Sequence, residues 1–261
     1  MQCAEFQTQE HVAMRMRIIS VYFKCLYSSS EEVVAVAYDS LKATLAQQSK
    51  LPKDLLRSGL QPILMTLADR HRLTSAGLDG LAHLLQLLTN YFKVEIGIKL
   101  LDHLSALAEP AMLRRAAAGP LDTHEKLRIL TAIVRVFHLL PDTAYQFLPR
   151  LLVYVAEIES HLRRSGPTPL TDMLTLFLDH FSEHTVRYYF ESDGHVRFTD
   201  VLQNPRLFRL LRLALQSPRG ASLRRELSRR AETLFLPLLS DASNTQSVYA
   251  ALQLIEALVQ H

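Results

Sequence analysis

The sequence is poor in the residues that a many-stranded sheet or a disulfide-bonded scaffold requires. Its 261 residues include only 8 glycines, 11 prolines and 2 cysteines. So few glycines and prolines leave little turn chemistry for a β-sheet protein, and leucine and alanine dominate where valine and isoleucine would in a sheet. Cys3 and Cys25 cannot build a disulfide framework, which favours a reduced intracellular compartment. We therefore predict an all-α protein.

Long hydrophobic runs and a strong net charge are also lacking. The richest apolar windows, residues 18–26 and 127–140, are interrupted by Lys24, Arg128 and Arg135. They are well short of the roughly 18 residues that a membrane-spanning helix needs, and the N-terminal stretch lacks the regions of a secretory signal. The formal net charge of +3 is too small to imply a nucleic-acid partner by itself. The composition predicts a soluble protein that does not enter a membrane.

What the sequence does contain is helical periodicity, which is clearest between residues 74 and 107. Apolar side chains recur there at spacings of three and four, namely Leu78, Leu81, Leu84, Leu85, Leu87, Leu88, Tyr91 and Phe92. They leave a single polar line, made of Asp79, His83, Gln86 and Asn90. Such a helix must be covered on most sides, so Leu85 is expected to be buried and Gln86 exposed. A second helix, expected after a turn at residues 90–93, should pack antiparallel on it.

Paired helices recur along the chain. Hairpins begin near His11, Pro52, Val94, Asp122, Thr168, Pro205 and Thr245. Their spacing scatters around about 40 residues, as in HEAT and armadillo arrays. We predict a HEAT/armadillo-like α-solenoid of stacked antiparallel helix pairs, one segment over residues 1–261 with weaker breaks near 110–121 and at 165–169. Because the last helix is apolar on more than one side and no capping repeat is recognisable, we expect a fragment of a much longer chain.

Turn and capping residues predict individual helix boundaries. Ser29 with Glu32, and Asp122 with Glu125, have the spacing of a capping box. Thr168-Pro169 is expected to start a helix. Longer helices are expected over residues 144–164 and 221–239, with a loop at residues 192–194 between shorter elements.

Few residues could carry chemistry. His180 and His184 have the spacing of zinc ligands on a helix, but no third ligand or cysteine pair stands near them, so ordinary turn histidines are the favoured interpretation. The run Gly77-Leu78-Asp79-Gly80 has no strand before it and indicates helix entry or packing rather than a phosphate loop. Cys25 and residues 188–190 fit core filling better than catalysis or base stacking. We predict no catalytic residue, metal site, cofactor or enzymatic activity.

Charge is most uneven between residues 206 and 230, where eight arginines face a single acidic residue, Glu226. Arg206, Arg209 and Arg212 can share one helix face and present guanidinium groups to acidic protein or to phosphate. The candidate partner-binding residues are Arg206, Arg209, Arg212, Arg224 and Arg225. The favoured alternative is a solvated face, or pairing with acidic residues of neighbouring segments.

Five stretches carry a family resemblance. They read R-I-I-S-V-Y-F-K-C-L-Y-S, K-L-P-K-D-L-L-R-S-G-L-Q-P-I-L, R-L-T-S-A-G-L-D-G-L-A-H-L-L-Q-L-L-T-N-Y-F-K-V-E-I-G-I-K-L-L-D-H-L, H-L-L-P-D-T-A-Y-Q-F-L-P-R-L and E-S-H-L-R-R-S-G-P-T-P-L. Here the chain resembles the HEAT solenoid of the TRRAP-type transcription-associated proteins, the pseudokinase branch of the phosphatidylinositol-kinase-related kinases. The arginine-rich end resembles it less clearly. The resemblance implies an internal segment of a giant, nuclear, non-catalytic scaffold subunit of SAGA-type histone acetyltransferase complexes.

Two functions of different classes follow. The first is an interaction scaffold whose helical surface docks transcription activators and sister subunits of a histone acetyltransferase complex. The second is a nucleic-acid-binding solenoid that uses the arginine cluster, with an affinity that falls steeply with salt. A general transport or adaptor solenoid would differ from the first only in its partner.

Overall fold

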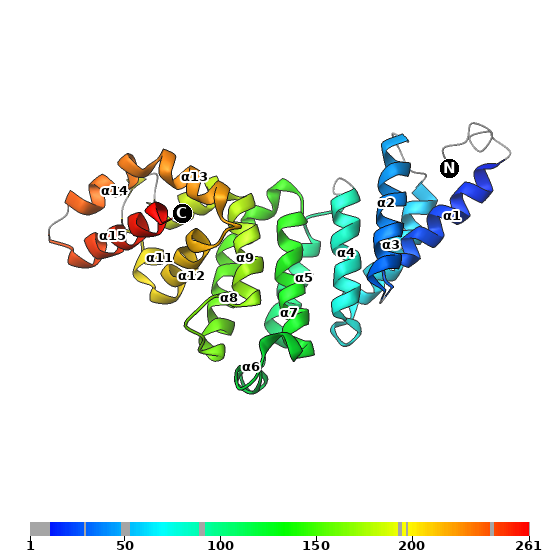
Figure 1. Cartoon of the computed structure of the whole chain (residues 1–261), viewed down its shortest axis with the longest axis horizontal. Coiled ribbons are helices and arrows are strands. Elements are labelled where there is room, and N and C mark those ends of the chain that lie inside the picture. Colours follow the sequence, from blue (N-terminus) through cyan, green and yellow to red (C-terminus); the bar gives the residue numbers. More distant parts are fainter. Residues whose placement is uncertain are drawn as a thin grey trace. The chain divides into compact units, whose positions relative to one another are not determined.

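The computed structural model describes residues 11–28, 30–47, 53–88, 92–192, 195–196, 198–240 and 243–260. Contacts group the chain into two units, residues 1–99 and 100–261. Both are built from helices (Figure 1), which confirms the all-α prediction. The strands found among the described residues are β1 Glu191–Ser192 and β2 His195–Val196, a short antiparallel pair. That the chain forms one continuous segment stays a prediction.

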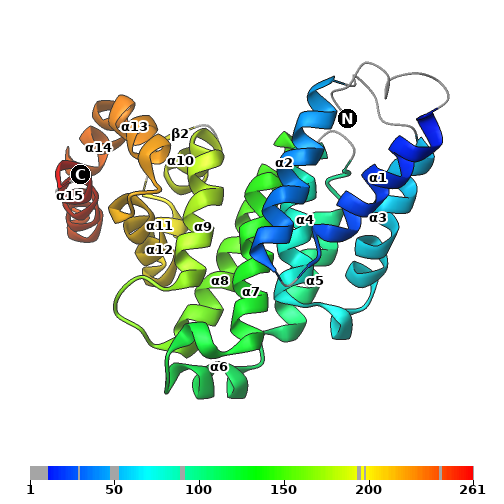
Figure 2. The same ribbon diagram turned by 45° about the vertical axis from the view of Figure 1, so that its right-hand side comes forward.

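The first unit is a group of helices in which α1 packs against two neighbouring helices. Its elements are α1 Val12–Cys25, α2 Glu31–Gln47, α3 Lys53–Ala68, the 3-10 turn η3 Arg70–Arg72, α4 Ser75–Leu88 and the start of α5 Ile96–Leu107. Helix α1 packs on α2 and on α3, and both of these also contact α4 (Figure 2). Ile19, Phe23 and Leu26 of the α1 segment are each 1% exposed and form the apolar contact. The amphipathic pattern thus produces the helix pairing in this unit.

Helix α4 faces its neighbours as its sequence pattern predicts. Leu85 is completely buried, whereas Gln86 is exposed. The helix entry is capped because the Thr74 hydroxyl oxygen accepts a hydrogen bond from the Gly77 amide at 3.0 Å. A Cβ atom on Gly80 would lie 2.5 Å from Cδ1 of Tyr27, so only glycine allows this approach. Entry and packing therefore explain the two glycines, as expected.

The second unit contains most of the helices. They are α6 Pro110–Ala117, α7 Glu125–Val136, α8 Leu148–Leu162, α9 Pro169–His180, α10 Ser182–Phe190, α11 Asp200–Gln203, α12 Pro205–Gln216, α13 Ala221–Arg229, α14 Ala231–Ser240 and α15 Thr245–Val259. The 3-10 turns η5 Leu121–Thr123, η6 Phe137–Leu139 and η7 Asp142–Phe147 connect some of them. The start of α9 after Thr168 and the start of α15 at Thr245 confirm the sequence predictions.

Corresponding helices of successive pairs stack on one another in this unit. Helix α6 packs on α8 and α8 on α12, while α7 packs on α9 and α9 on α13 (Figure 1). Phe137 and Phe177 meet edge to face between the second set, with centroids 6.1 Å apart. Stacking of this kind is what a HEAT-type array requires, because each pair covers the apolar side of the next. The predicted stacking of antiparallel helix pairs is confirmed.

Several predicted boundaries are wrong for local reasons. The weaker break expected near residues 110–121 stays a prediction; this range contains helix α6, with Pro110 in its first turn, where a missing amide costs nothing. Asp122 and Glu125 form no capping box, since Asp122 lies in η5 and α7 starts after His124, whose side chain makes no capping bond. The helix expected over residues 144–164 begins only at Leu148, with Pro149 in its first turn.

Two further differences lie in the C-terminal half and one near the N-terminus. The helix expected over residues 221–239 is divided into α13 and α14 at Arg230, whose guanidinium pairs with Glu191. The loop expected at residues 192–194 is flanked by the two short strands, and positions 193–194 lie outside the described residues. Ser29 of the first capping box also lies outside them, and the Ser30 hydroxyl accepts from the Val33 amide at 3.5 Å instead.

Candidate functional site

The candidate partner-binding arginines do not form one open face. Arg206 and Arg225 are exposed, whereas the side chain of Arg209 is only 27% exposed. Arg212 is half-buried, and its Nε atom has no hydrogen-bond partner among the described residues. Helical spacing alone suggested a shared face, but the neighbouring pair α8–α9 covers part of α12. Whether any of these residues binds a partner stays a prediction.

Three arginines bind backbone carbonyls near the C-terminal ends of stacked helices, and we call them the arginine clamps: Arg164, Arg209 and Arg224. One Nη atom of Arg164 donates to the carbonyls of Ala117 and Gly119, at 2.9 and 2.8 Å. One Nη atom of Arg209 donates to the carbonyls of Arg164 and Gly166, at 2.6 and 3.2 Å. The clamps therefore engage the ends of α6 and α8 in the same way.

The third clamp closes the end of the next stacked helix. Arg224 donates from one Nη atom to the carbonyls of Leu215 and Ser217, at 2.8 and 2.5 Å, at the end of α12. Each clamp thus binds two carbonyls two residues apart. The last carbonyls of a helix lack intrahelical partners and carry the negative end of the helix dipole, so a guanidinium satisfies both needs.

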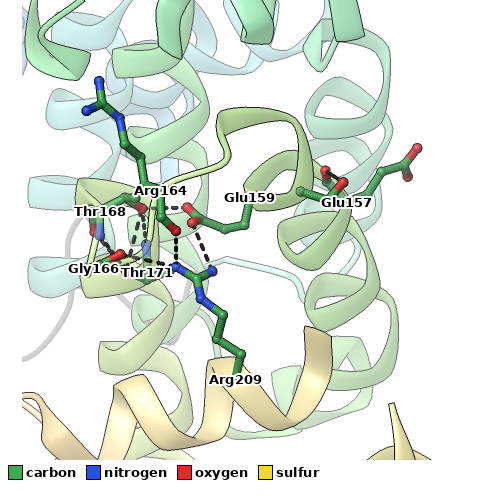
Figure 3. Close-up of polar contacts among 8 residues, drawn as sticks. Glu157, Glu159, Arg164, Gly166, Thr168, Thr171 and Arg209 are labelled. Carbon is green, nitrogen blue, oxygen red and sulfur yellow. Dashed lines mark hydrogen bonds and ion pairs between the residues drawn. The ribbon is translucent and has the colours of Figure 1, made fainter. Parts of the chain in front are cut away.

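Arg209 also reaches a buried carboxylate, as Figure 3 shows. Its Nη1 atom lies 3.5 Å from Oε2 of Glu159, whose side chain is 2% exposed. This distance suits an ion pair but is long for a hydrogen bond, and Oε2 has no hydrogen-bond partner among the described residues. The other oxygen, Oε1, accepts from the hydroxyl of Thr168 at 2.5 Å. A carboxylate of α8 is therefore held between α12 and the start of α9.

Burial decides the protonation behaviour of Glu159. Removal from water raises the pKa of this carboxyl above its ordinary value of 4.5. The hydrogen bond from Thr168 and the charge of Arg209 act in the opposite direction and favour the ionised form. The polar cluster depends on these two partners, because an unpaired carboxylate at this depth would be very costly.

Thr168 joins the cluster to helix α9. Its hydroxyl accepts from the Thr171 amide at 3.2 Å, while the Thr171 hydroxyl accepts from the Thr168 amide at 2.8 Å. This is a reciprocal capping box in a buried place. Polar contacts with residues of α8, α9, α12 and the end of α6 together therefore fix the turn after α8.

Neither the Glu159 cluster nor the role of Arg164 was predicted from the sequence. One signal was present, because Glu159 falls in the apolar row of Leu152, Val155, Ala156 and Leu162. A charged residue within such a row indicates a buried polar partner. The partner itself lies 50 positions away in the chain, at Arg209, which periodicity cannot identify.

The other residues considered from the sequence have structural neighbours. The ring of His184 stacks on Tyr145 with centroids 3.9 Å apart, and His180 meets Phe181 edge to face. Among the described residues, no group of three or more His, Cys, Asp or Glu side chains could hold a metal ion. Tyr189 and Phe190 are buried, as expected for core residues. Within the described parts of the chain, no helix is both long and apolar enough to cross a bilayer.

Comparison with known proteins agrees with this architecture. Residues 1–261 match the family described as the Tra1 HEAT repeat ring region. The chain is 43% identical over 205 residues to the SAGA complex/NuA4 acetyltransferase complex subunit Tra1 of Schizosaccharomyces pombe. It is 42% identical over 185 residues to the subunit TRA1 of the same complexes in Saccharomyces cerevisiae. With the Transformation/transcription domain-associated protein of Danio rerio, the identity is 24% over 240 residues.

These relatives are far longer than the region they share with this chain. The alignments cover 77%, 71% and 90% of this chain, but only 6%, 5% and 6% of the respective relatives. The match to the family nevertheless spans every residue, and the helix-pair stacking is of the HEAT type. The chain belongs to the Tra1 HEAT repeat ring family.

Proposed function

We propose that this chain is a non-catalytic scaffold segment of a transcription coactivator subunit in SAGA-type and NuA4-type histone acetyltransferase complexes. The observation that carries the proposal is the family match over residues 1–261, together with relatives that are named as subunits of these complexes. In this function the chain belongs to a much longer protein that works in the nucleus. Its partners are sister subunits and transcription activators.

The architecture supports a scaffold rather than an enzyme. Stacked helix pairs offer broad, rigid surfaces, and the polar cluster at Glu159 is used to join helices rather than to receive a substrate. Rigid surfaces suit docking, because little conformational entropy is lost when a partner binds.

Recovery of complex subunits from nuclear extract tests this proposal. The affinity-tagged chain should capture subunits of SAGA or NuA4 above the level of an unrelated helical-repeat protein of similar size and charge. Cross-linking of the assembled complex, followed by mass spectrometry, should then place lysines of this region beside a sister subunit. Capture equal to that of the control, with no cross-link in the assembled complex, would argue against the scaffold function.

A second candidate, binding of nucleic acid, is supported by the exposure of Arg206 and Arg225. Fewer arginines serve this function than the sequence suggested, because Arg209 and Arg224 act as clamps. The double variant Arg206→Glu with Arg225→Glu leaves the clamps intact. It should weaken binding to duplex DNA or RNA and reduce the salt dependence of that binding. If the unchanged chain binds neither, or binds without salt dependence, this candidate fails.

A further inference from the structure

A groove of about 500 Å³ lies in the second unit, away from the clamps. On one side stand η7 and the start of α8, with Tyr145 and Pro149, and on the other stands α10, with His184 and Tyr188. His184 and Tyr188 are four residues apart on one helix, so they share a face at a spacing of roughly 5–6 Å between Cβ atoms. This volume is within the range of sites that bind ligands or peptide segments.

Aromatic rings line the groove on both sides and meet within it. Tyr145 lies almost parallel to His184, with an angle of 17° between the rings and 3.9 Å between their centroids. Tyr188, one turn further along α10, packs edge to face on the buried Tyr189, whose hydroxyl donates to the Leu207 carbonyl at 2.9 Å. These rings are therefore held by the fold before any partner binds.

The polar groups of the groove are oriented as well. Arg187 pairs with Glu183 at 3.1 Å and with Glu191 at 3.5 Å, so its charge is balanced within α10 and its end. Asp200 is exposed on the rim and has no ion pair with any residue that the structure describes. The unbalanced charge at the groove is therefore negative.

We propose that this groove binds a proline-rich segment of a partner protein that carries an arginine or lysine beside its prolines. A polyproline II segment has flat rings and free backbone carbonyls, and it loses little entropy on binding, which suits a groove lined by rigid aromatic rings. Tyr145 and Tyr188 line the groove, and their hydroxyls can donate hydrogen bonds to those carbonyls. Asp200 would attract the basic side chain.

A helical partner fits the groove less well. An amphipathic helix requires a continuous apolar trough for its anchors at every three to four residues. Here Leu148 and Val201 are the aliphatic lining residues, and Arg187, Glu191 and Asp200 interrupt them. An extended segment can place prolines against the rings and leave its polar edge toward these charges.

The site gives the proposed scaffold one class of partner, and it can be tested without the complex, so either proposal can fail alone. The probe is a fluorescein-labelled peptide of about ten residues that contains the repeat Pro-Pro-Leu-Pro-Pro-Arg. Its controls are the same peptide with alanine in place of proline, and with glutamate in place of arginine. Fluorescence anisotropy should show saturable binding of the first peptide and much weaker binding of both controls.

Variants of the chain locate the site. Tyr188→Ala and Tyr145→Ala should each weaken binding by about tenfold, because each removes one aromatic ring from the lining of the groove. Tyr145 is 42% exposed, so Tyr145→Ala should keep the fold even if Tyr188→Ala does not. Circular dichroism checks the folding of both variants. Asp200→Asn should weaken the arginine peptide by about threefold and leave the glutamate peptide unchanged or tighter. Tyr249→Ala, at a tyrosine of α15 that is 63% exposed and outside the groove, is the matched control.

Any one of the following results would overturn the proposal. One is the absence of saturable binding, and another is equal binding of the proline and alanine peptides. The third is an affinity that Tyr145→Ala leaves unchanged, or stronger competition by an amphipathic helical peptide than by the proline-rich one.

Discussion

Replacing Arg209 by methionine should destabilise the second unit strongly, and the reason lies in what the side chain leaves behind. The variant removes both carbonyl hydrogen bonds of this clamp and the ion pair with Glu159. Removing one partner of a buried pair costs about 3–5 kcal/mol. Because Arg209 is 27% exposed and partly screened by water, we expect a loss of about 3 kcal/mol, at the lower end of that range.

Arg206→Met is the matched control. It removes the same charge from the same helix, but Arg206 is exposed and its loss should change stability by less than about 0.5 kcal/mol. Urea unfolding followed by circular dichroism measures both variants, since the chain has no tryptophan to report by fluorescence. Equal effects of the two substitutions would show that Arg209 is merely a surface charge.

The pairing with Glu159 can be separated from the clamp by a double-mutant cycle. Glu159→Gln keeps the shape of the side chain but carries no charge, so Arg209→Met should cost about 1–2 kcal/mol less in that background. A coupling energy near zero would show that the ion pair contributes nothing and that the carbonyl bonds alone explain the effect.

The dependence on pH has a definite sign. Burial already raises the pKa of Glu159 above 4.5, and removal of Arg209 should raise it further. The folded state then binds a proton more readily than the unfolded state, so this contribution to stability is present at low pH and is lost as the pH rises through the raised pKa. The deficit of Arg209→Met should therefore be smaller near pH 5 than near pH 8. A deficit that does not change with pH would contradict this account.

Three further substitutions test the packing of the helices, and a fourth tests another dependence of stability on pH. Leu85→Ala should cost about 2–5 kcal/mol in unfolding free energy, while Gln86→Ala should be nearly silent; equal effects would refute the facing of α4. Gly80→Ala should destabilise by about 1–2 kcal/mol despite its better helix propensity, because the new Cβ meets Tyr27; a stabilised variant would contradict the close contact. Burial lowers the pKa of His138 to about 4. Its contribution to stability, present above the unfolded value of 6.5, should fall by up to about 1.4 kcal/mol per unit as the pH drops toward 4, and His138→Gln should flatten that slope in urea unfolding.

Periodicity and cap residues predicted those helices whose ends are decided locally. Thr168-Pro169 marks the start of α9 because threonine caps and proline suits the first turn, and both are adjacent in sequence. Helix α15 begins at Thr245 as predicted, since its apolar pattern begins after Asn244, whose side chain accepts from the Ser247 amide.

Helix ends that depend on distant residues could not be predicted in this way. The apolar pattern runs without interruption across Arg230, so a single helix was the reasonable expectation for residues 221–239. The chain instead leaves helical geometry at Arg230, where its guanidinium pairs with Glu191, 39 positions earlier. A local pattern contains no information about a partner at that separation.

The arginine cluster illustrates the same limit for the candidate site. Composition distinguishes only a basic segment, whereas the role of each guanidinium depends on whether carbonyls stand open beside it. Arg209 and Arg224 meet such carbonyls, whereas Arg206 and Arg225 are exposed and meet none among the described residues, although all four looked alike in the sequence.

Two of the arginine clamps, Arg164 and Arg209, also explain how stacked pairs keep their register while their sequences diverge. Arg164 reaches carbonyls 47 and 45 positions earlier, and Arg209 reaches carbonyls 45 and 43 positions earlier, so the two contacts repeat at nearly the same interval. Apolar packing between helices tolerates changes of side chain and therefore specifies register weakly. Backbone carbonyls are present whatever the residue, so Arg164 and Arg209 can each hold one helix pair against the preceding one, whereas Arg224 binds carbonyls only 9 and 7 positions earlier. The repeat is therefore seen in the spacing of hydrogen bonds and not in recurring residues. For this reason the period of about 45 residues is clear in the structure but only approximate in the sequence.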